Sequence, residues 1–455
     1  SRMAEVLNRV ILKAKRGSAP AQINVPRDFW TQVVDIELPS IIEFERPSGG
    51  AAAITEAAKL LSNAKFPVIL SGAGVVLADA IEDCKKIAEK LDAPVACGYQ
   101  HNDSFPGKHP LAIGPLGYNG SKAAMEIISK ADVVLALGTR LNPFSTLPGY
   151  GIDYWPKEAK IIQVDFNSDR IGLAKKISVG ICGDAKLVAQ QILSQLSSTA
   201  GDSGREDRKA LIHQTKSAWL QTLTSLDHEE DDEGTTWNKD SRERDPDRMS
   251  PRMAWRAIQA GLPDDAIISS DIGNNCAIGN AYPTFEQGRK YLAPGLFGPC
   301  GYGFPSVLGA KIGCPNTPVV GFSGDGAFGI SMSEMTSCSR EEWPNITMVI
   351  FRNYQWGAEK RNTTLWYDNN FIGTELDPKL SYAKIAEACG FKGVKVTTQS
   401  ELTEALKASC VDQMNGITTF IEVILNQELG EPFRRDAMKA PVEVAGINSQ
   451  DTVVQ

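Results

Sequence analysis

Short apolar runs alternate with helical patterns through the first half of the chain. The runs predict strands at 67–70, 94–97, 132–138, 160–165 and 177–181. Apolar residues at helical spacing predict helices at 51–63, 79–91 and 121–130. Strands that alternate with helices indicate a parallel sheet covered by helices. We therefore predict a doubly wound, Rossmann-like α/β domain over residues 50–196, preceded by a linker at 31–49.

The same alternation returns in the second half of the chain. Ser250 and Pro251 form a helix start, with serine as the N-cap and proline in the first turn. Apolar runs then predict strands at 266–269, 319–322, 346–351, 393–396 and 419–425. We predict a second doubly wound parallel-sheet domain over 250–426 and a C-terminal arm at 427–455.

Two further segments lie outside these domains. Residues 197–249 are polar and charged, so we interpret them as a linker that carries one helix at about 205–226. Residues 3–15 have helical spacing, and residues 20–26 resemble one short buried strand. A helix and a strand cannot bury their own faces alone. We therefore interpret 1–30 as the remnant of a third, N-terminal α/β domain and expect a longer natural polypeptide; an appendage packed on the next domain is the alternative.

Composition narrows the functional classes. A net charge of -8 argues against a non-specific nucleic-acid binder or a basic membrane-surface protein. No apolar run reaches the roughly 20 residues that a membrane helix needs. The nine cysteines include no C-x-x-C pair and there are only four histidines, which argues against a disulfide framework or a thiol–histidine metal cluster. We expect a cytoplasmic protein with no nucleic-acid or membrane partner.

Polar residues follow two of the apolar strands of the second domain. Asp325 and Gly326 end the strand at 319–322, and Asn353 and Gln355 end the strand at 346–351. In a doubly wound sheet, such carboxyl ends meet at one crevice. A carboxylate, an amide oxygen and a backbone carbonyl suit Mg²⁺ or Ca²⁺. The helix that opens at Gly326 and Ala327 offers N–H groups to phosphates. Taken singly, G-D-G and a lone asparagine are more often turn residues.

A second glycine-rich turn, Ser71 to Gly74, follows the first strand of the central domain. It lacks a complete G-x-G-x-x-G pattern, so we interpret it as a strand-to-helix turn rather than as a nucleotide site.

The sequence G-D-G, followed by 26 residues and an asparagine, resembles the metal–diphosphate motif of thiamine-diphosphate-dependent enzymes. Almost the whole chain resembles the acetolactate-synthase-like family. Segments 98–110, 137–156, 351–362 and 426–439 are most similar to its sulfoacetaldehyde-using branch. The resemblance implies the tail of a pyrimidine-binding domain, a central domain and a diphosphate-binding domain. It also implies thiamine diphosphate and Mg²⁺ as cofactors, in a homodimer or homotetramer.

The resemblance also assigns residues. The metal ligands would be Asp325, Asn353 and the backbone carbonyl of Gln355. The cofactor-binding residues would be Ile272, Gly273, Asn274, Asn275, Gly298, Cys300, Gly324, Gly326 and Ala327. Glu359 matches a catalytic position near the reacting carbon, whereas the family's activating glutamate is expected outside this chain. Two positions depart from the family pattern: Arg352 replaces a common asparagine, and Cys300 is smaller than the usual aliphatic residue under the cofactor.

The implied reaction converts sulfoacetaldehyde and phosphate to acetyl phosphate and sulfite, through an acetyl group carried on the cofactor. Its anions would need a positive pocket, for which Arg352, Lys360 and Arg361 are candidates, with Arg434 and Arg435 in the C-terminal arm. Surface ion pairs are the alternative role for these residues. The alternative activities are those of an acetolactate synthase or a 2-oxoacid decarboxylase, and outside the enzymes, an inactive cofactor-binding or regulatory module.

Overall fold

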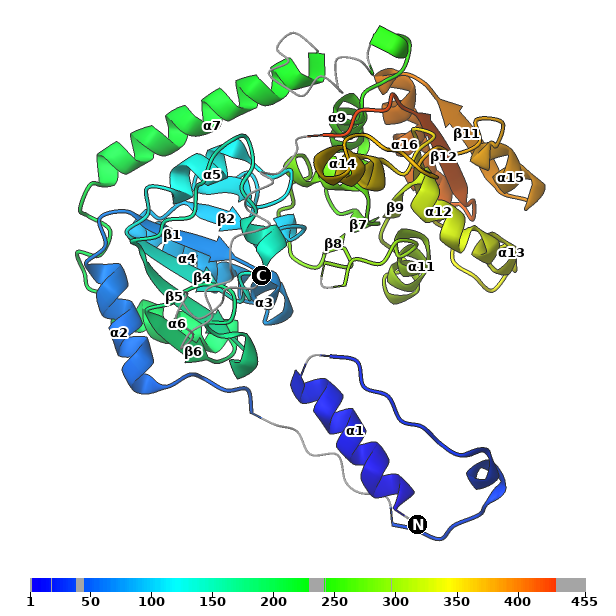
Figure 1. Ribbon diagram of the computed structural model, residues 1–455. Coiled ribbons are helices and arrows are strands. Elements are labelled where there is room, and N and C mark those ends of the chain that lie inside the picture. Colours follow the sequence, from blue (N-terminus) through cyan, green and yellow to red (C-terminus); the bar gives the residue numbers. More distant parts are fainter. Residues whose placement is uncertain are drawn as a thin grey trace.

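Two parallel-sheet domains lie side by side, and the long helix α7 (Arg205–His228) runs from one to the other (Figure 1). The computed structural model describes residues 2–17, 19–37, 45–228, 241, 243–295 and 297–430. Among these residues, no helix is both long enough and apolar enough to cross a membrane. The predicted fold class, two doubly wound α/β domains, is confirmed.

The central domain has the strand order β3-β2-β1-β4-β5-β6, with every pair parallel. Its strands are β1 (Pro67–Ser71), β2 (Val95–Cys97), β3 (Ala112–Pro115), β4 (Val133–Leu137), β5 (Lys160–Asp165) and β6 (Val179–Cys182). Its helices are α2 (Ala51–Ser62), α3 (Ala73–Leu77), α4 (Ile81–Leu91), α5 (Lys122–Ile128) and α6 (Ala185–Gln195). The apolar runs predicted all of these strands except β3, whose glycine and proline interrupt its apolar pattern.

The second domain has the order β11-β12-β10-β9-β7-β8, again all parallel. Its strands are β7 (Ile267–Ser270), β8 (Tyr291–Leu292), β9 (Val319–Gly324), β10 (Thr347–Arg352), β11 (Lys392–Val396) and β12 (Thr419–Ile424). Its helices are α9 (Pro251–Gly261), α10 (Asn274–Ile278), α11 (Gly303–Gly313), α12 (Asp325–Ser331), α13 (Met335–Cys338), α14 (Gly357–Trp366), α15 (Tyr382–Ala388) and α16 (Gln399–Met414). Strand β9 lies between β7 and β10, so residues that follow these three strands share one edge.

Short 3-10 turns complete the described elements. They are η1 (Arg27–Thr31), η2 (Asn102–Ser104), η3 (Pro143–Thr146), η4 (Ser168–Arg170), η5 (Gly279–Ala281) and η6 (Met332–Glu334).

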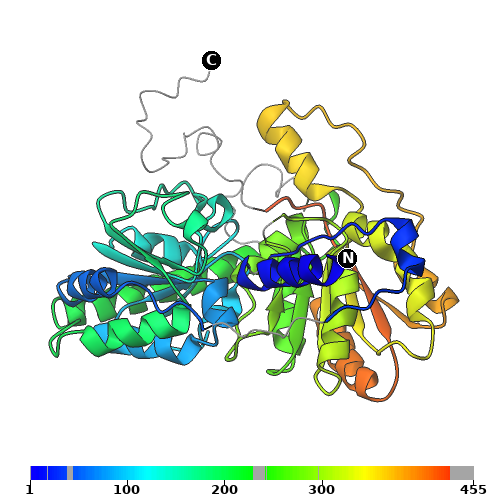
Figure 2. The ribbon, with the colours of Figure 1, turned by 90° about the horizontal axis from the view of Figure 1, so that it is seen from below.

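The N-terminal segment matches its prediction only in part. Helix α1 (Met3–Gly17) forms, but none of its residues is buried, and it lies apart from both sheets (Figure 1). Seen from below, it lies in front of the domains (Figure 2). The strand predicted at 20–26 is wrong, because these residues form no strand and are mostly exposed. A strand needs a neighbour for its backbone hydrogen bonds, and no described strand lies beside this segment.

Polar contacts fix one domain against the other. Asn102 Nδ2 donates to the carbonyls of Asn280 (2.9 Å) and Pro283 (2.8 Å), and Asn280 Oδ1 accepts from the Gln100 backbone N–H (3.1 Å). Asn102 and Asn280 are both buried, so these hydrogen bonds replace contacts with water. Asn280 lies in η5, directly after α10, and so the central domain supports a helix of the second domain.

Helix α7 packs on both domains and covers the residues, about 205–226, where the sequence predicted one helix. Ile212 lies in the core of the central domain, whereas Trp219 and Leu223 pack in the core of the second. Near its first turn, Arg208 is only 1% exposed. Its guanidinium donates five hydrogen bonds, to the backbone carbonyls of Lys65, Leu91, Asp92, Gly201 and Ser203, at 2.7–3.0 Å.

We predict that Arg208→Lys lowers the stability of the protein by about 2–4 kcal/mol, because a lysine cannot satisfy five separated carbonyls. A thermal melt would show this as a lower Tm. The neighbouring Lys209→Ala is the control. Its exposed ion pairs should contribute less than about 1 kcal/mol. An unchanged Tm for Arg208→Lys would contradict the anchoring role.

Candidate functional site

Three polar residues meet at the carboxyl edge of the second sheet. Asp271 follows β7, Asp325 follows β9 at the start of α12, and Asn353 follows β10. All three are at least 99% buried. The topology thus brings together side chains that are up to 82 positions apart in the sequence (353 minus 271).

The predicted metal ligands converge on one point. The Asn353 side-chain amide oxygen faces Asp325 Oδ1 and the backbone carbonyl oxygen of Gln355, each 3.3 Å away. Oxygens this close repel one another unless a cation lies between them or the amide turns over to donate to both. One carboxylate, one amide oxygen and one carbonyl oxygen are ligands that suit a hard divalent cation such as Mg²⁺. The donor set therefore fits the predicted metal.

Hydrogen bonds fix the Asp325 carboxylate in place. Oδ2 accepts from Arg352 Nη1 (3.0 Å) and from the Tyr354 N–H (2.7 Å), and Oδ1 accepts from the Gly326 N–H (3.0 Å). Burial raises the pKa of the Asp325 carboxyl to about 6, although the Arg352 guanidinium acts in the opposite direction.

Glycines leave open space beside these ligands. An added Cβ at Gly273 or Gly324 would meet no atom within 4 Å, and one at Gly298 would touch only Ile272 Cγ1, at 4.0 Å. Gly273 and Gly298 also have positive φ angles, 140° and 70°, which favour glycine. A phosphate or a ring can therefore approach the backbone where the sequence predicted cofactor contacts.

The segment 426–430 supports the other side of the site, and the sequence reasoning missed this role. Asn274 Nδ2 donates to the Glu428 carbonyl (3.1 Å), and Gln355 Nε2 donates to the Gln427 carbonyl (3.1 Å). The side-chain oxygens of Asn274, Asn275 and Gln355 are buried and have no hydrogen-bond partner among the described residues. Buried oxygens of this kind require a donor or a cation, and a bound group can supply one.

Asp271 is a second residue that the sequence reasoning missed. Its carboxylate accepts hydrogen bonds from the N–H groups of Ile272 (2.8 Å), Gly301 (3.0 Å) and Gly303 (2.9 Å), and from Ser323 Oγ (3.0 Å). Burial raises the pKa of Asp271 despite these four donors. The carboxylate ties the loop 298–303 to β9. Its only signal in the sequence was an acid directly after an apolar strand.

Cys300 and Glu359 lie on the more open side of the site. Cys300 is half-buried, and its pKa is raised first by burial and then by the nearby carboxylates of Asp271 and Glu359. Glu359 is exposed in the first turn of α14. The predicted catalytic carboxylate is therefore accessible and lies beside the loop under the predicted cofactor.

The three predicted anion-binding cations are all buried. Arg352 pairs with Asp325, and Lys360 Nζ pairs with Glu375 Oε1 at 2.5 Å. Arg361 lies over the Tyr118 ring, 4.4 Å from its centroid, and burial lowers the pKa of Arg361 to about 10. For Arg352 and Lys360 this favours internal pairing over contact with a substrate anion. Arg434 and Arg435 lie outside the described residues.

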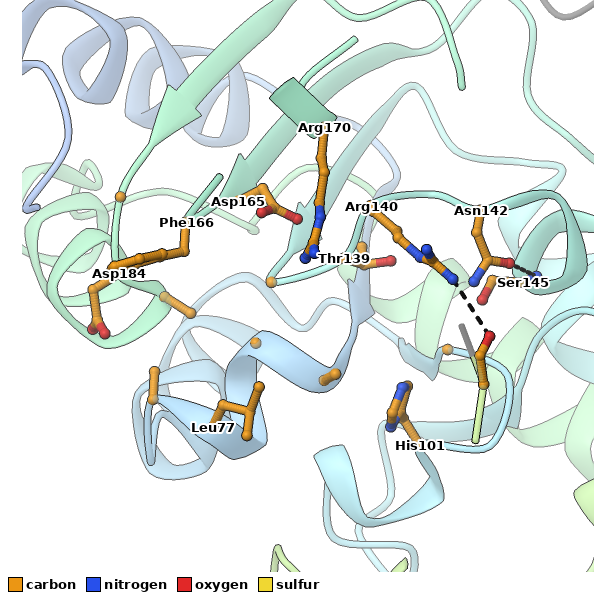
Figure 3. A pocket seen from close by; sticks show the side chains of 18 of the residues that line it. Leu77, His101, Thr139, Arg140, Asn142, Ser145, Asp165, Phe166, Arg170 and Asp184 are labelled. Atoms are coloured by element: carbon orange, nitrogen blue, oxygen red, sulfur yellow. Dashed lines mark hydrogen bonds between the residues drawn. The ribbon is translucent and has the colours of Figure 1, made fainter. Parts of the chain in front are cut away.

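A separate cavity of about 710 Å³ lies at the carboxyl ends of the strands of the central domain (Figure 3). Arg140, Asp165 and Arg170 point into it. Beside it, an added Cβ at Gly72 or Gly74 would lie 2.6 Å from the backbone of Gly138. These glycines thus let two turns pack closely, in keeping with the interpretation of 71–74 as a strand-to-helix turn. None of the predicted metal or cofactor residues lines this cavity.

Comparison with known proteins identifies the family. Residues 54–192 match the description "Thiamine pyrophosphate enzyme, central domain", and residues 271–423 match "Thiamine pyrophosphate enzyme, C-terminal TPP binding domain". The chain belongs to the thiamine pyrophosphate enzyme family. The predicted resemblance is thus confirmed, and thiamine diphosphate with Mg²⁺ is the cofactor pair of this family.

The chain is more similar to some members of this family than to others. The chain is 76% identical to the probable sulfoacetaldehyde acetyltransferase of Rhizobium meliloti (strain 1021), over all of this chain and 77% of that protein. It is 73% identical to the sulfoacetaldehyde acetyltransferase of Roseovarius nubinhibens, over 99% of this chain and 75% of that one. A probable acetolactate synthase large subunit of Methanocaldococcus jannaschii is 30% identical, over 85% of this chain and 64% of that protein.

We predict that Gly326→Ala weakens thiamine diphosphate binding in the full-length protein. A Cβ at Gly326 would lie 2.9 Å from three ring carbons of Trp356, and such overpacking costs about 1–3 kcal/mol. Titration of the cofactor in the presence of Mg²⁺ gives the dissociation constant. The double variant Gly326→Ala/Trp356→Leu should recover part of the affinity. Gly309→Ala, where a Cβ meets no atom within 4 Å, is the matched control. If Gly326→Ala bound thiamine diphosphate as tightly as the unsubstituted protein, the close approach of Gly326 to the Trp356 ring would not matter for cofactor binding.

Proposed function

We propose that the protein is an acyltransferase that converts sulfoacetaldehyde and phosphate to acetyl phosphate and sulfite. The observation that carries the proposal is the 76% identity, over the whole chain, to a probable sulfoacetaldehyde acetyltransferase. The arrangement of Asp325, Asn353 and Gln355 supports it, because these oxygens suit the metal that such an enzyme needs.

In this proposal, the chain's residues bind and orient the cofactor. Asp325, Asn353 and the Gln355 carbonyl hold Mg²⁺, and the backbone at Gly273, Gly324 and Gly326 faces the diphosphate. Asp271 fixes the loop that carries Gly298 and Cys300 beneath the cofactor rings. Thiamine diphosphate, when bound, supplies a nucleophilic carbon that can attack an aldehyde and accept its electrons.

The balance of the reaction shows where a protein acid is needed. The C–S bond of sulfoacetaldehyde breaks and its electron pair leaves with sulfite. The methylene carbon must then gain a proton to become a methyl group, while the aldehyde carbon loses its hydrogen and forms a bond to a phosphate oxygen. We assign this proton movement to Glu359, because it is exposed and lies close enough to Cys300 to affect its pKa.

The same proposal includes a cytoplasmic homodimer or homotetramer. All nine cysteines are unpaired, which supports a reducing compartment. Acetolactate synthase activity is the weaker candidate, since the relative of that name is only 30% identical.

Product analysis of the full-length protein tests the proposal. With thiamine diphosphate and Mg²⁺, we expect sulfite and acetyl phosphate in equal amounts from sulfoacetaldehyde, and only when phosphate is present. Acetolactate or carbon dioxide from pyruvate, without sulfite release, would instead indicate a synthase or decarboxylase. No turnover of either substrate, with intact cofactor binding, would indicate a binding or regulatory module.

We predict that Glu359→Gln lowers kcat by about 100-fold, which is typical of losing a general acid. The amide keeps the size of the side chain but cannot deliver the proton. Steady-state sulfite release gives kcat, and the exposed Glu387→Gln in α15 serves as the control. A kcat equal to that of the control would remove Glu359 from the mechanism.

A further inference from the structure

Arg352 is a fully buried cation that contacts a metal ligand. It is the last residue of β10, and its exposed fraction is 0%. Its guanidinium lies over the Tyr354 ring, 4.3 Å from the ring centroid, and also faces Tyr382 at 5.4 Å. Because the side chain is fully buried beside these rings, the guanidinium has no face open to solvent. Its role must therefore lie in what it contacts inside the protein.

The guanidinium joins the Asp325 carboxylate to the polypeptide around it. Nη1 donates to Asp325 Oδ2 at 3.0 Å, and Nη2 donates to the carbonyls of Asp377 and Leu380. Tyr382, the first residue of α15, donates its hydroxyl to the Asp325 carbonyl at 2.8 Å. Both the side chain and the backbone of Asp325 are thus held from the segment 377–382.

Glu422 on β12 balances the charge of Arg352. Its Oε1 lies 3.8 Å from Arg352 Nε, and Glu422 is 2% exposed. Its Oε2 accepts from Ser381 Oγ (2.7 Å) and from the Ala383 N–H (3.1 Å). Glu422, Arg352 and Asp325 therefore form a buried chain of alternating charge that ends at the metal ligand.

We propose that Arg352, whose charge is balanced by Glu422, is a positioning residue that sets the orientation of Asp325 toward the divalent cation. An aspartate carboxylate rotates over a broad, roughly two-fold range. With Oδ2 fixed by Arg352 and the Tyr354 N–H, Oδ1 is the oxygen that faces the Asn353 side-chain amide, which also lies beside the Gln355 carbonyl. Partners that orient a ligand in this way typically change metal affinity by about 10- to 100-fold when they are removed.

The planar fork of arginine explains why lysine cannot replace it. One ammonium group cannot reach Asp325 Oδ2 and the carbonyls of Asp377 and Leu380 at once, nor stack flat on an aromatic ring. The inference rests on the proposed metal site but not on the identity of the substrate. Metal binding can therefore test it even if the proposed reaction is wrong.

The experiment measures Mn²⁺ binding to the full-length protein by electron paramagnetic resonance, with thiamine diphosphate present and no substrate. We expect Arg352→Lys and Arg352→Met to bind Mn²⁺ about 10- to 100-fold more weakly. Glu422→Gln should shift the affinity in the same direction by a smaller factor. At saturating metal, the KM values for both substrates should stay within about threefold of those of the unsubstituted protein, because the defect lies in metal affinity.

Arg208→Lys is the matched control, a buried arginine bound to carbonyls in the other domain. It should lower the Tm without changing Mn²⁺ affinity. If Arg352→Met fails to fold, Arg352→Lys and Glu422→Gln provide the measurement. Mn²⁺ affinity unchanged in these variants would overturn the proposal. A rise in the KM for phosphate or sulfoacetaldehyde with unchanged metal affinity would also overturn it, and would show that Arg352 acts on a substrate anion.

Discussion

The removal of one carboxylate from water is the constraint on which the site depends. Asp325 is buried at the edge of a parallel sheet, where an unpaired charge would be strongly unfavourable. Three hydrogen-bond donors compensate it in part, yet its pKa remains raised to about 6. In the proposed metal site, a divalent cation would complete this compensation, because its charge would neutralise the carboxylate. The surrounding loops are arranged to keep this carboxylate in one orientation.

Two acidic residues perform different tasks in the same crevice. Asp325 offers an oxygen to the centre of the site. Asp271 instead directs both of its oxygens toward the Ile272 N–H, the loop 298–303 and Ser323. Asp325 is therefore suited to binding a metal ion, and Asp271 to holding the loop 298–303 in place. Neighbouring strands of one sheet thus supply a binding group and the support of the loop that faces it.

Much of this arrangement could be predicted from the sequence, because its signals are local. Apolar runs with polar ends predicted the strands, and strand–helix–strand spacing predicted that Asp325 and Asn353 meet. The short edge strand β8 was missed because its two residues have no period. The strand at 20–26 was wrong because strand formation depends on a neighbour that a local pattern cannot supply. The position of Arg352 depends on residues 377–383 and on Glu422, and no spacing rule links these to β10.

Hydrogen bonds between the two domains let the central domain influence the position of residues in the candidate site. Asn280 follows α10, the helix that carries Asn274 and Asn275, and its amide bonds to backbone groups of the central domain. From the central domain, Asn102 in turn donates hydrogen bonds to the carbonyls of Asn280 and Pro283. The two domains are therefore joined by hydrogen bonds directly after the C-terminal end of α10. The position of α10 therefore depends on the hydrogen bonds that the turn after it, η5, makes to the central domain.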